Sequence, residues 1–294
     1  LNFLFMVNSY EVIKIVRACD KKPVYLVERD QDMFIAKPFS PVEPMLTDLN
    51  HKSVARCYGL GRLTRHGKKI GDDFAISEYV PGKPLVRTEN NLPIDMVTMY
   101  AHNILEGLIY LDKNGRAHGD ISGGNVIVGT DHGAKLVDTS SSIFFGNSRE
   151  KSTYECTPAF AAPEVLLMHR IIREKSEVYS TGVLLHDMLH VDGFANQRGI
   201  TQKLSPLAKS KDLDYLSKTY EKAMATDLSS PQQVTPEFGF LNSYSAKLLE
   251  RCAGHPRLRS ILEAMLELQP NNRPNLAEAE SEFAHIDKTL LLAN

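Results

Sequence analysis

Residues 118–128 read HGDISGGNVIV, a polar loop that runs into a short apolar strand. The loop carries Asp120 and, five positions later, Asn125. By themselves, an aspartate and an asparagine at this spacing are more typical of an ordinary turn. A second apolar run, however, ends in Asp138, thirteen residues beyond Asn125. Polar side chains thus flank two short apolar runs, and one function could account for all of them.

Phosphoryl transfer accounts for all three polar side chains. Neighbouring strands can bring two carboxylates and an amide together at their open ends. One carboxylate then orients the attacking hydroxyl group, while the other carboxylate and the amide oxygen hold Mg²⁺. The sequence therefore predicts a magnesium-dependent phosphoryl-transfer site around Asp120, Asn125 and Asp138.

The composition is that of a soluble globular chain without a marked charge. Its 294 residues allow one large domain or two modest ones. Hydrophobic residues make up 43% and charged residues 24%, and the formal net charge is −2. This charge gives no reason to expect nucleic acid or an anionic membrane as a partner. No apolar run approaches the ~18 residues of a membrane span, so we expect none.

The four cysteines are scattered, without the pairing typical of a metal site. This pattern indicates reduced thiols and a cytoplasmic location. The chain begins with Leu1 rather than methionine, so we expect an excised domain, with room for flanking domains.

Apolar periodicity divides the chain into strands first and helices later. Short β-rich runs predict strands at Tyr10–Val16, Val24–Val27, Met33–Ala36 and Phe74–Ile76. Periodic apolar residues predict helices at 96–111, 258–268 and 276–292, and a buried helix at 178–189. Residues 193–239 show weak periodicity and predict a short helix with long loops. Strands followed by helices indicate an α+β fold with two segregated parts.

The motifs together resemble those of protein kinases, over nearly the whole chain. The 118–128 loop and Asp138 resemble the kinase catalytic loop and metal-binding motif. Other matches follow in the family's order: the strand with the phosphate-binding lysine at 34–37, the hinge at 77–80 with Ser77 as a small gatekeeper, the substrate-docking segment at 156–164, the start of the buried helix at 177–182, and the late Arg-Pro motif at 272–274.

The resemblance implies a bilobal protein-kinase-like fold of the α+β class. Its N-lobe would be a small antiparallel β-sheet at residues 8–80, with the hinge at 77–81, and its mainly helical C-lobe would span 82–292. Within the C-lobe, the catalytic loop would lie at 118–125, the metal motif at 138–140 and the activation segment at 138–164. In the family, the arginine equivalent to Arg273 pairs with the glutamate equivalent to Glu164.

The resemblance also implies the site residues and the cofactors, ATP and Mg²⁺. Lys37 would contact phosphate, Asp120 would be the catalytic aspartate, and Asn125 and Asp138 would hold the metal. The nucleotide would be bound by a set of residues from both lobes: Val24, Ile35, Glu78, Val80, Ile127, Lys37 and Asp138. Ile35 is larger than the usual alanine and predicts a tight pocket. The partner would be a protein substrate.

Two departures from the family pattern affect the N-lobe. The loop at 17–23, where the family has a glycine-rich loop, contains no glycine, so its backbone cannot approach phosphate closely. Lys21 or Lys22 could supply a charge there, although a solvated turn is the plainer interpretation. The partner of Lys37 is also open: Glu43 is the first candidate, and Asp48 or no partner are the alternatives.

Three departures affect the catalytic machinery. Gly119 replaces the arginine that grips a phosphate on the activation segment, so that kind of switching has no receptor here. Ser122 replaces a lysine that donates to the transferring group, and losing one such donor typically costs ~10²–10³ in rate. Thr139 and Ser140 replace the Phe-Gly of the metal motif.

Three functions remain in competition. An active protein kinase is favoured because Lys37, Asp120, Asn125 and Asp138 are all present, and Thr157 matches the threonine of the serine/threonine class. A pseudokinase that binds nucleotide or serves as a scaffold is the main alternative. A small-molecule phosphotransferase shares the His-Gly-Asp loop but lacks the peptide-docking segment. At the level of the fold, the divergence from the family pattern is similar to that of kinase effectors that bacterial pathogens deliver into host cells. Delivery into the cytoplasm of a host cell is therefore an alternative location.

Overall fold

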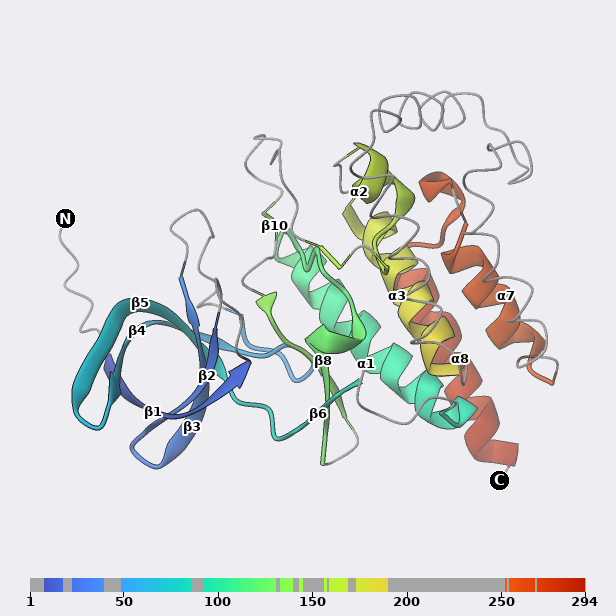
Figure 1. The fold of residues 1–294 in the computed structure, drawn as a ribbon. Coiled ribbons are helices and arrows are strands. Elements are labelled where there is room, and N and C mark those ends of the chain that lie inside the picture. Colours follow the sequence, from blue (N-terminus) through green and yellow to red (C-terminus); the bar gives the residue numbers. More distant parts are fainter. Residues whose placement is uncertain are drawn as a thin grey trace.

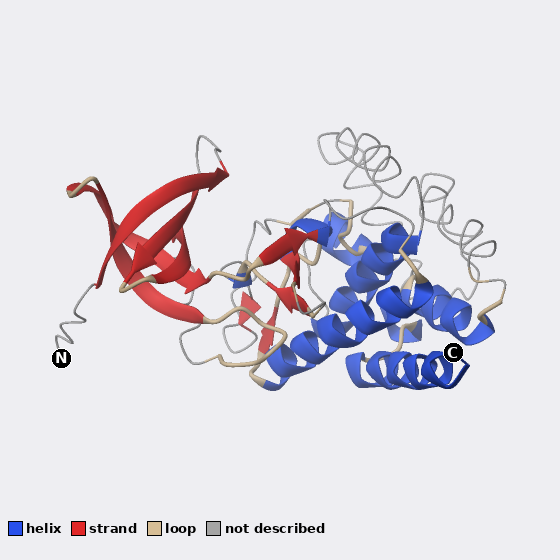
Figure 2. Cartoon of the chain, turned by 90° about the horizontal axis from the view of Figure 1, so that it is seen from below, coloured by secondary structure: helices blue, strands red, loops and turns tan. Residues whose placement is uncertain are grey.

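The protein consists of a curved β-sheet followed by a mainly helical part, as the computed structural model shows (Figures 1 and 2). The structure describes residues 8–17, 23–39, 49–85, 92–130, 133–139, 143–144, 156–157, 159–168, 173–189, 252, 254–267 and 269–293. The weakly periodic stretch at 193–239 lies outside them, as do Lys21, Lys22, Glu43 and Asp48. No helix among the described residues is long and apolar enough to cross a membrane.

The N-terminal sheet contains five strands in the order β1-β2-β3-β5-β4. Their bounds are β1 (Asn8–Arg17), β2 (Val24–Arg29), β3 (Asp32–Pro38), β4 (Cys57–Arg65) and β5 (Lys68–Glu78). Consecutive strands pair antiparallel, whereas β1 also pairs parallel with β4. The strands predicted at β1, β2, β3 and β5 are confirmed, and β5 is much longer than expected.

Two tight hairpins shape this sheet. Asp30 and Gln31 both have positive φ angles, 54° and 71°, as do His66 and Gly67, at 52° and 72°. Positive φ at both central residues is the requirement of a type I′ turn, whose twist suits a two-residue hairpin loop.

Strand β4 is absent from the sequence-based prediction, because glycines interrupt its apolar pattern. Gly59 lies at a register shift in the pairing with β5 and has a φ of 106°. A Cβ atom at Gly61 would lie 2.6 Å from Ile76 and 2.7 Å from Tyr10, so only glycine fits there. Each glycine thus marks a place where backbone must bend or approach closely.

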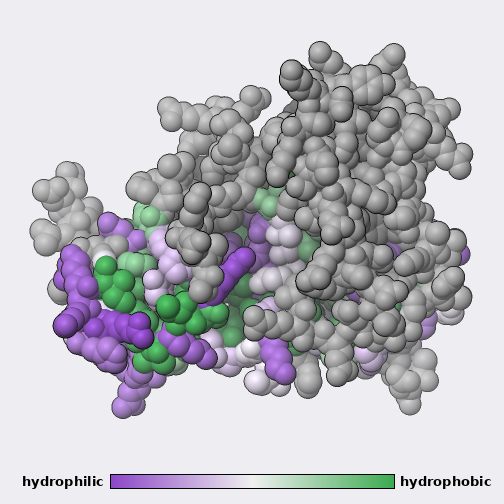
Figure 3. Space-filling model, in the orientation of Figure 1, coloured by the Kyte–Doolittle hydropathy of each residue, from purple (hydrophilic) through white to green (hydrophobic). Residues whose placement is uncertain are grey.

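The N-terminal sheet has its own small core, which is separate from the larger core of the helical part. Its buried members are Tyr10, Val12, Val27, Ala36, Leu63, Phe74 and Ile76. Apolar side chains are also exposed on this sheet, and Figure 3 shows both hydrophilic and hydrophobic groups on its outer surface. Because side chains alternate along a strand, burial of Ala36 turns Ile35 and Lys37 to the opposite face.

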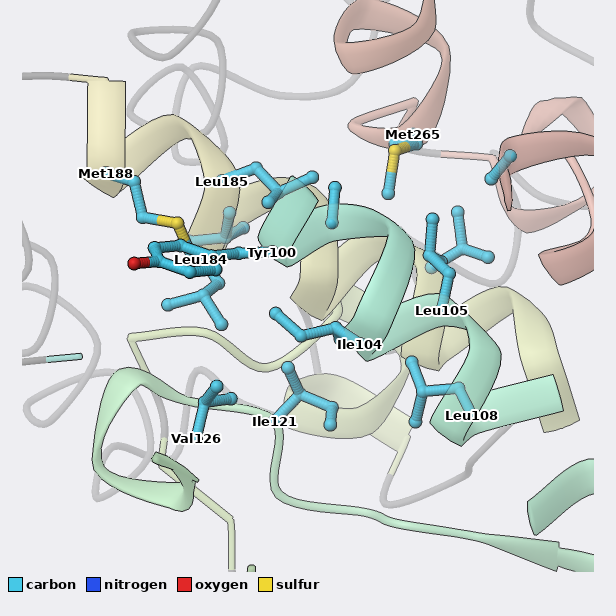
Figure 4. Close-up of a cluster of buried hydrophobic side chains, with 14 of the residues drawn as sticks. Tyr100, Ile104, Leu105, Leu108, Ile121, Val126, Leu184, Leu185, Met188 and Met265 are labelled. Carbon is cyan, nitrogen blue, oxygen red and sulfur yellow. The ribbon is translucent and has the colours of Figure 1, made fainter. Parts of the chain in front are cut away.

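The helical part packs around α1 (Ile94–Lys113) and α3 (Arg173–Leu189). Figure 4 shows Tyr100, Ile104, Leu105 and Leu108 of α1 with Leu184, Leu185 and Met188 of α3. The remaining helices are α2 (Pro163–Met168), α7 (Pro256–Met265) and α8 (Leu276–Ala293), with 3-10 turns η2 (Gly123–Asn125) and η6 (Pro270–Asn272).

The helix predictions are largely confirmed. Residues 176–189 of α3 are buried without exception, as the all-round apolar pattern predicts. Met96 and Met99, which were predicted to lie on the apolar face of α1, are only partly buried. Helix α7 ends at Met265, three residues before the predicted end, because the chain turns at Leu266.

Short strands complete the helical part and position the polar loop. A three-stranded sheet has the order β6 (Gly82–Pro84), β8 (Val126–Gly129) and β9 (Ala134–Leu136). A second pair joins β7 (Arg116–Ala117) to β10 (Ile143–Phe144). Because β8 and β9 are antiparallel, the start of β8 lies beside the end of β9. Asn125 and Asp138 therefore both lie next to these paired strand ends.

Candidate active site

The loop from His118 to Asn125 is anchored to helix α3 by a buried carboxylate. Glu177, only 4% exposed, accepts hydrogen bonds from the backbone N–H groups of His118 at 3.1 Å and Gly119 at 3.0 Å. Burial raises the pKa of Glu177, while His118 and the two N–H groups oppose that rise. The paired N–H groups offset part of the cost of burying this acid.

Gly119 has a backbone conformation that glycine adopts most easily. Its φ angle is 83°, in the left-handed region, where a Cβ atom causes strain. In the sequence, Gly119 only marks the loss of the family's arginine. In the structure it has a conformational role. Its left-handed conformation sets the direction of the chain after the two N–H groups that bind Glu177, toward Asp120.

His118 ties the loop to the segment that follows β9. Its Nε2 lies 2.9 Å from the carbonyl oxygen of Val137, and its Nδ1 accepts the N–H of Asp120 at 3.3 Å. Because Nδ1 accepts, the ring proton that donates to Val137 is the one on Nε2. His118 therefore sits between Asp120 and the residue that precedes Asp138.

The carboxylate of Asp120 is held on both oxygens. Asn125 Nδ2 donates to Oδ2 at 2.7 Å and to the Asp120 carbonyl at 2.8 Å. The backbone N–H of Thr157 donates to Oδ1 at 2.6 Å. The contact that the family resemblance implies for Thr157 therefore runs through its backbone, which nearly any residue could supply. This contact by itself does not distinguish a serine/threonine site.

Lys37 and Asp138 form an ion pair between the N-terminal sheet and the helical part. Lys37 Nζ lies 2.6 Å from Asp138 Oδ2, and the two side chains are 26% and 24% exposed. Asp138 has a φ of 66°, which is uncommon for a residue other than glycine, although aspartate tolerates it better than most. Glu43, the predicted partner of Lys37, lies outside the described residues.

The predicted nucleotide-contact residues lie on both sides of this ion pair. Strand register pairs Leu26 with Ile35, which puts Val24, two residues from Leu26, on the face of the sheet that carries Ile35 and Lys37. Ile127 lies in the middle strand of the three-stranded sheet. Val80 lies between β5 and β6, where the chain leaves the N-terminal sheet.

Glu78, another predicted contact, ends β5 and is engaged through its side chain. Its Oε1 lies 2.6 Å from Lys135 Nζ, and its Oε2 accepts the N–H of Arg56 at 3.0 Å. Both carboxylate oxygens are therefore engaged by protein groups, and the predicted contact of Glu78 with a nucleotide stays a prediction.

The predicted pair of Glu164 and Arg273 is confirmed and fully buried. Two parallel contacts join them, from Nη1 to Oε1 at 2.7 Å and from Nη2 to Oε2 at 3.0 Å. Ser176 donates to the same carboxylate, and the guanidinium lies over the Tyr179 ring. Such bidentate geometry and further donors are what a buried ion pair needs. The pair fixes the segment after Thr157 against α3.

Cysteine chemistry is not favoured at this site. Burial, together with the neighbouring Asp120, raises the pKa of the Cys156 thiol to about 11. A thiol attacks as thiolate, so Cys156 stays protonated and weakly reactive near neutral pH.

Sequence reasoning missed two anchoring carboxylates of the site. Glu177 was recognised only as part of a motif, and the Glu78–Lys135 contact was not predicted. An acidic residue at the start of an all-apolar helix was the available signal for Glu177, because burying a charge there requires partners. No comparable local signal marks Glu78, which lies at the exposed end of a strand.

Comparison with known proteins decides the family. The model of the family described as "Protein kinase domain" matches residues 43–283 of this chain. This chain belongs to the protein kinase family. The match covers the catalytic loop, the Asp138 motif and both members of the Glu164–Arg273 pair, and it implies the two-lobed architecture of that family.

Several kinases are similar over part of the chain. Maternal embryonic leucine zipper kinase of Danio rerio is 30% identical over 149 residues, 49% of this chain and 21% of that protein. Serine/threonine-protein kinase ppk25 of Schizosaccharomyces pombe is 32% identical over 143 residues, 44% of this chain and 34% of that protein. Mitogen-activated protein kinase 13 of Mus musculus is 26% identical over 63% of this chain and 49% of that protein. The chain thus spans half or less of these relatives.

Proposed function

We propose that this kinase-family chain transfers the γ-phosphoryl group of ATP to a serine or threonine hydroxyl of a protein substrate. The observation that carries the proposal is the pairing of four side chains: Asn125 holds Asp120, and Lys37 contacts Asp138. Residues 8–80 would form the ATP-binding lobe, with the hinge at 77–81, and residues 82–292 the catalytic lobe.

Asp120 is the proposed catalytic aspartate. Its carboxylate is oriented by Asn125 and Thr157, each of which occupies one lone pair of an oxygen atom. Both oxygens keep capacity to accept a further hydrogen bond. Asp120 would use it to orient the attacking hydroxyl group of the substrate.

Asn125 and Asp138 fit a magnesium site. Both side-chain bonds of Asn125 leave from Nδ2, so its amide oxygen is the atom that would bind a cation. Asp138 supplies a carboxylate at the same edge of the sheet, and oxygen ligands of these kinds suit Mg²⁺. When bound, Mg²⁺ neutralises charge on the phosphates. Lys37, already beside Asp138, would contact a phosphate, and Val24, Ile35 and Ile127 would enclose the adenine.

The positive φ of Asp138 supports a functional role for this residue. Residues held in sparsely populated conformations cost on the order of 1–3 kcal/mol and persist where the surroundings impose them. Here the strain coincides with the ion pair to Lys37 and with the bond from Val137 N–H to the Asn125 carbonyl at 2.9 Å. The conformation therefore aims the carboxylate at the sheet edge where the metal would lie.

The nature of residue 122 favours an alternative function, that of a pseudokinase. Ser122 stands where a lysine would donate to the transferring group, and it is buried at 4% exposure. A short, buried hydroxyl cannot replace a long cationic side chain. We therefore expect slow transfer even in the active protein, and nucleotide binding without transfer would identify the pseudokinase.

Two substitutions separate these functions. Asp120→Asn is nearly isosteric and should retain Mg-ATP binding while losing most phosphoryl transfer. Asp138→Ala should lose transfer and also the Mg²⁺-dependent part of ATP affinity. Binding is measured by calorimetry and transfer by incorporation of radiolabelled phosphate.

Asp30→Asn is the matched control, because the Asp30 side chain is 79% exposed in a hairpin turn and pairs with the neighbouring Arg29 rather than with a site residue. It should behave as the unmodified protein in both assays. Equal phosphate incorporation by the unmodified protein and by Asp120→Asn would contradict the catalytic proposal and leave the pseudokinase as the better function.

A further inference from the structure

A second ion pair connects the same two parts of the molecule as Lys37 and Asp138. Lys135 on β9 contacts Glu78 at the end of β5, with 2.6 Å between Nζ and Oε1. The side chains are 21% and 28% exposed, much like those of Lys37 and Asp138. Both pairs are therefore partly shielded from solvent and less screened than surface ion pairs.

The two ion pairs form a matched set of opposite polarity. Strand β3 places Phe34 opposite Glu78, and Lys37 follows three residues later. On the other side, Asp138 follows Lys135 by three residues. The N-terminal sheet thus supplies the cation of one pair, Lys37, and the anion of the other, Glu78. The segment at β9 supplies the opposite charges, Asp138 and Lys135.

Glu78 also fixes the chain at the start of β4. Its second carboxylate oxygen accepts the N–H of Arg56, and its own N–H donates to the Arg56 carbonyl at 2.8 Å. The adjoining residues are bonded to β9, because Ala55 N–H donates to Leu136 O and Leu136 N–H donates to Ser53 O, both at 2.8 Å. Glu78 is therefore bonded at once to β9 and to residues 53–56, the junction segment.

We propose that Glu78 and Lys135 are positioning residues that hold Lys37 at Asp138 and thereby set the affinity for Mg-ATP; this rests on the proposed nucleotide site. The two parts of the molecule have separate cores, so neither core by itself determines the distance between Lys37 and Asp138. The Glu78–Lys135 pair bridges them next to the site. Loss of the pair should loosen the site while leaving each core intact.

The test measures Mg-ATP affinity in single and paired variants. Glu78→Gln removes the charge but can still accept the Arg56 N–H, and Lys135→Met keeps the side-chain length. Each should weaken Mg-ATP binding about fivefold, as expected for a partly exposed ion pair. KM for ATP should rise by the same factor while kcat at saturating ATP stays the same, because the pair touches neither reacting group.

A double-mutant cycle distinguishes positioning from general damage. The double variant Glu78→Gln with Lys135→Met should weaken Mg-ATP binding about fivefold, no more than either single variant, because both changes remove the same pair, whereas independent damage would multiply to about 25-fold. Glu263→Gln is the matched control, since it removes an ion pair to Arg259 that lies wholly within α7. It should leave the affinity unchanged. Unaltered affinity in the single variants, or multiplied effects in the double variant, overturns the proposal.

Hydrogen exchange keeps this test independent of the proposed function. If the unmodified protein does not bind Mg-ATP, the nucleotide site itself is refuted. The positioning role is then measured by exchange of the Ala55 and Leu136 amides, which bond across the junction. Their exchange should be faster in Glu78→Gln, in Lys135→Met and, to the same extent, in the double variant, and normal in Glu263→Gln. Equal exchange in all five proteins overturns the positioning role as well.

Discussion

Helix α3 buries two carboxylates under opposite conditions. Glu177 accepts two backbone N–H groups, whereas neither oxygen of Asp187 has a hydrogen-bond partner among the residues that the structure describes, although Asp187 is only 6% exposed. Burial raises the pKa of Asp187 to about 8 from its ordinary value of 3.8. One buried carboxylate thus anchors the loop from His118 to Asn125 near the start of the helix, whereas the other, near its end, weakens the fold at neutral pH.

The sign of the pH effect follows from proton binding. Between pH 3.8 and about 8, the folded protein holds a proton on Asp187 that the unfolded chain has released. Folding therefore takes up a proton, and the free energy of unfolding should fall as pH rises through this window. Asp187→Asn has no titrating group, so it should remove this slope.

The measurement is the melting temperature of both proteins from pH 4 to pH 8.5. Relative to the unmodified protein, Asp187→Asn should gain stability toward high pH, by on the order of a few kcal/mol in total. The comparison of slopes is insensitive to any constant cost of burying the amide. Parallel curves would show that Asp187 is already ionised in the folded protein.

Close packing between elements depends on glycine at one point on α1. A Cβ atom at Gly107 would lie 3.0 Å from both the Ser53 carbonyl oxygen and Leu136 Cδ1. That carbonyl cannot easily move, because it accepts the Leu136 N–H. The junction segment and β9 therefore approach α1 more closely than any other residue type would allow.

Gly107→Ala should destabilise the protein despite the better helix propensity of alanine. Propensity alone would add about 1 kcal/mol in favour of alanine. We expect the crowding to exceed this gain and to leave a net loss of about 1–2 kcal/mol. Denaturant unfolding measures the difference. Gly254→Ala, which meets nothing within 4 Å, is the control and should cost little. A rise in stability of Gly107→Ala would contradict the packing argument.

At the scale of the whole molecule, the two parts have separate cores and are joined by polar contacts and by Cys57 of β4, which packs against the larger core. Lys37 with Asp138 and Glu78 with Lys135 join them, together with the backbone bonds of the junction segment. A ligand that binds on both sides adds contacts to the folded state only. Its binding should therefore stabilise the whole molecule against unfolding.

Lys37→Ala tests this coupling by thermal unfolding in Mg-ATP. At a hundred times its Kd, Mg-ATP should stabilise the unmodified protein by about 2.7 kcal/mol. Lys37→Ala should lose most of this increase because the phosphate loses its cation. Lys52→Ala, which removes a largely exposed lysine paired with Glu106, should keep it. An unchanged melting curve of the unmodified protein at millimolar Mg-ATP would refute nucleotide binding.

Local sequence patterns were enough to predict much of the helical structure and the family of this protein. Apolar spacing was enough to predict α1, α3 and α8, because each helix buries one or all of its faces. The order of motifs was enough to identify the family and the Glu164–Arg273 pair, whose members lie 109 residues apart. The roles of Lys37, Asp120, Asn125 and Asp138 stay predictions until the variants are measured.

Apart from the Glu164–Arg273 pair, only the tertiary structure decided which distant polar groups meet. Strand β4, the contact between Lys37 and Asp138, and the Glu78–Lys135 pair have no signature in local sequence. The reason is physical: apolar periodicity reports which face of an element is buried, a property of neighbouring residues. An ion pair or a close glycine contact depends on where two independently packed elements come to lie, which only the folded chain determines.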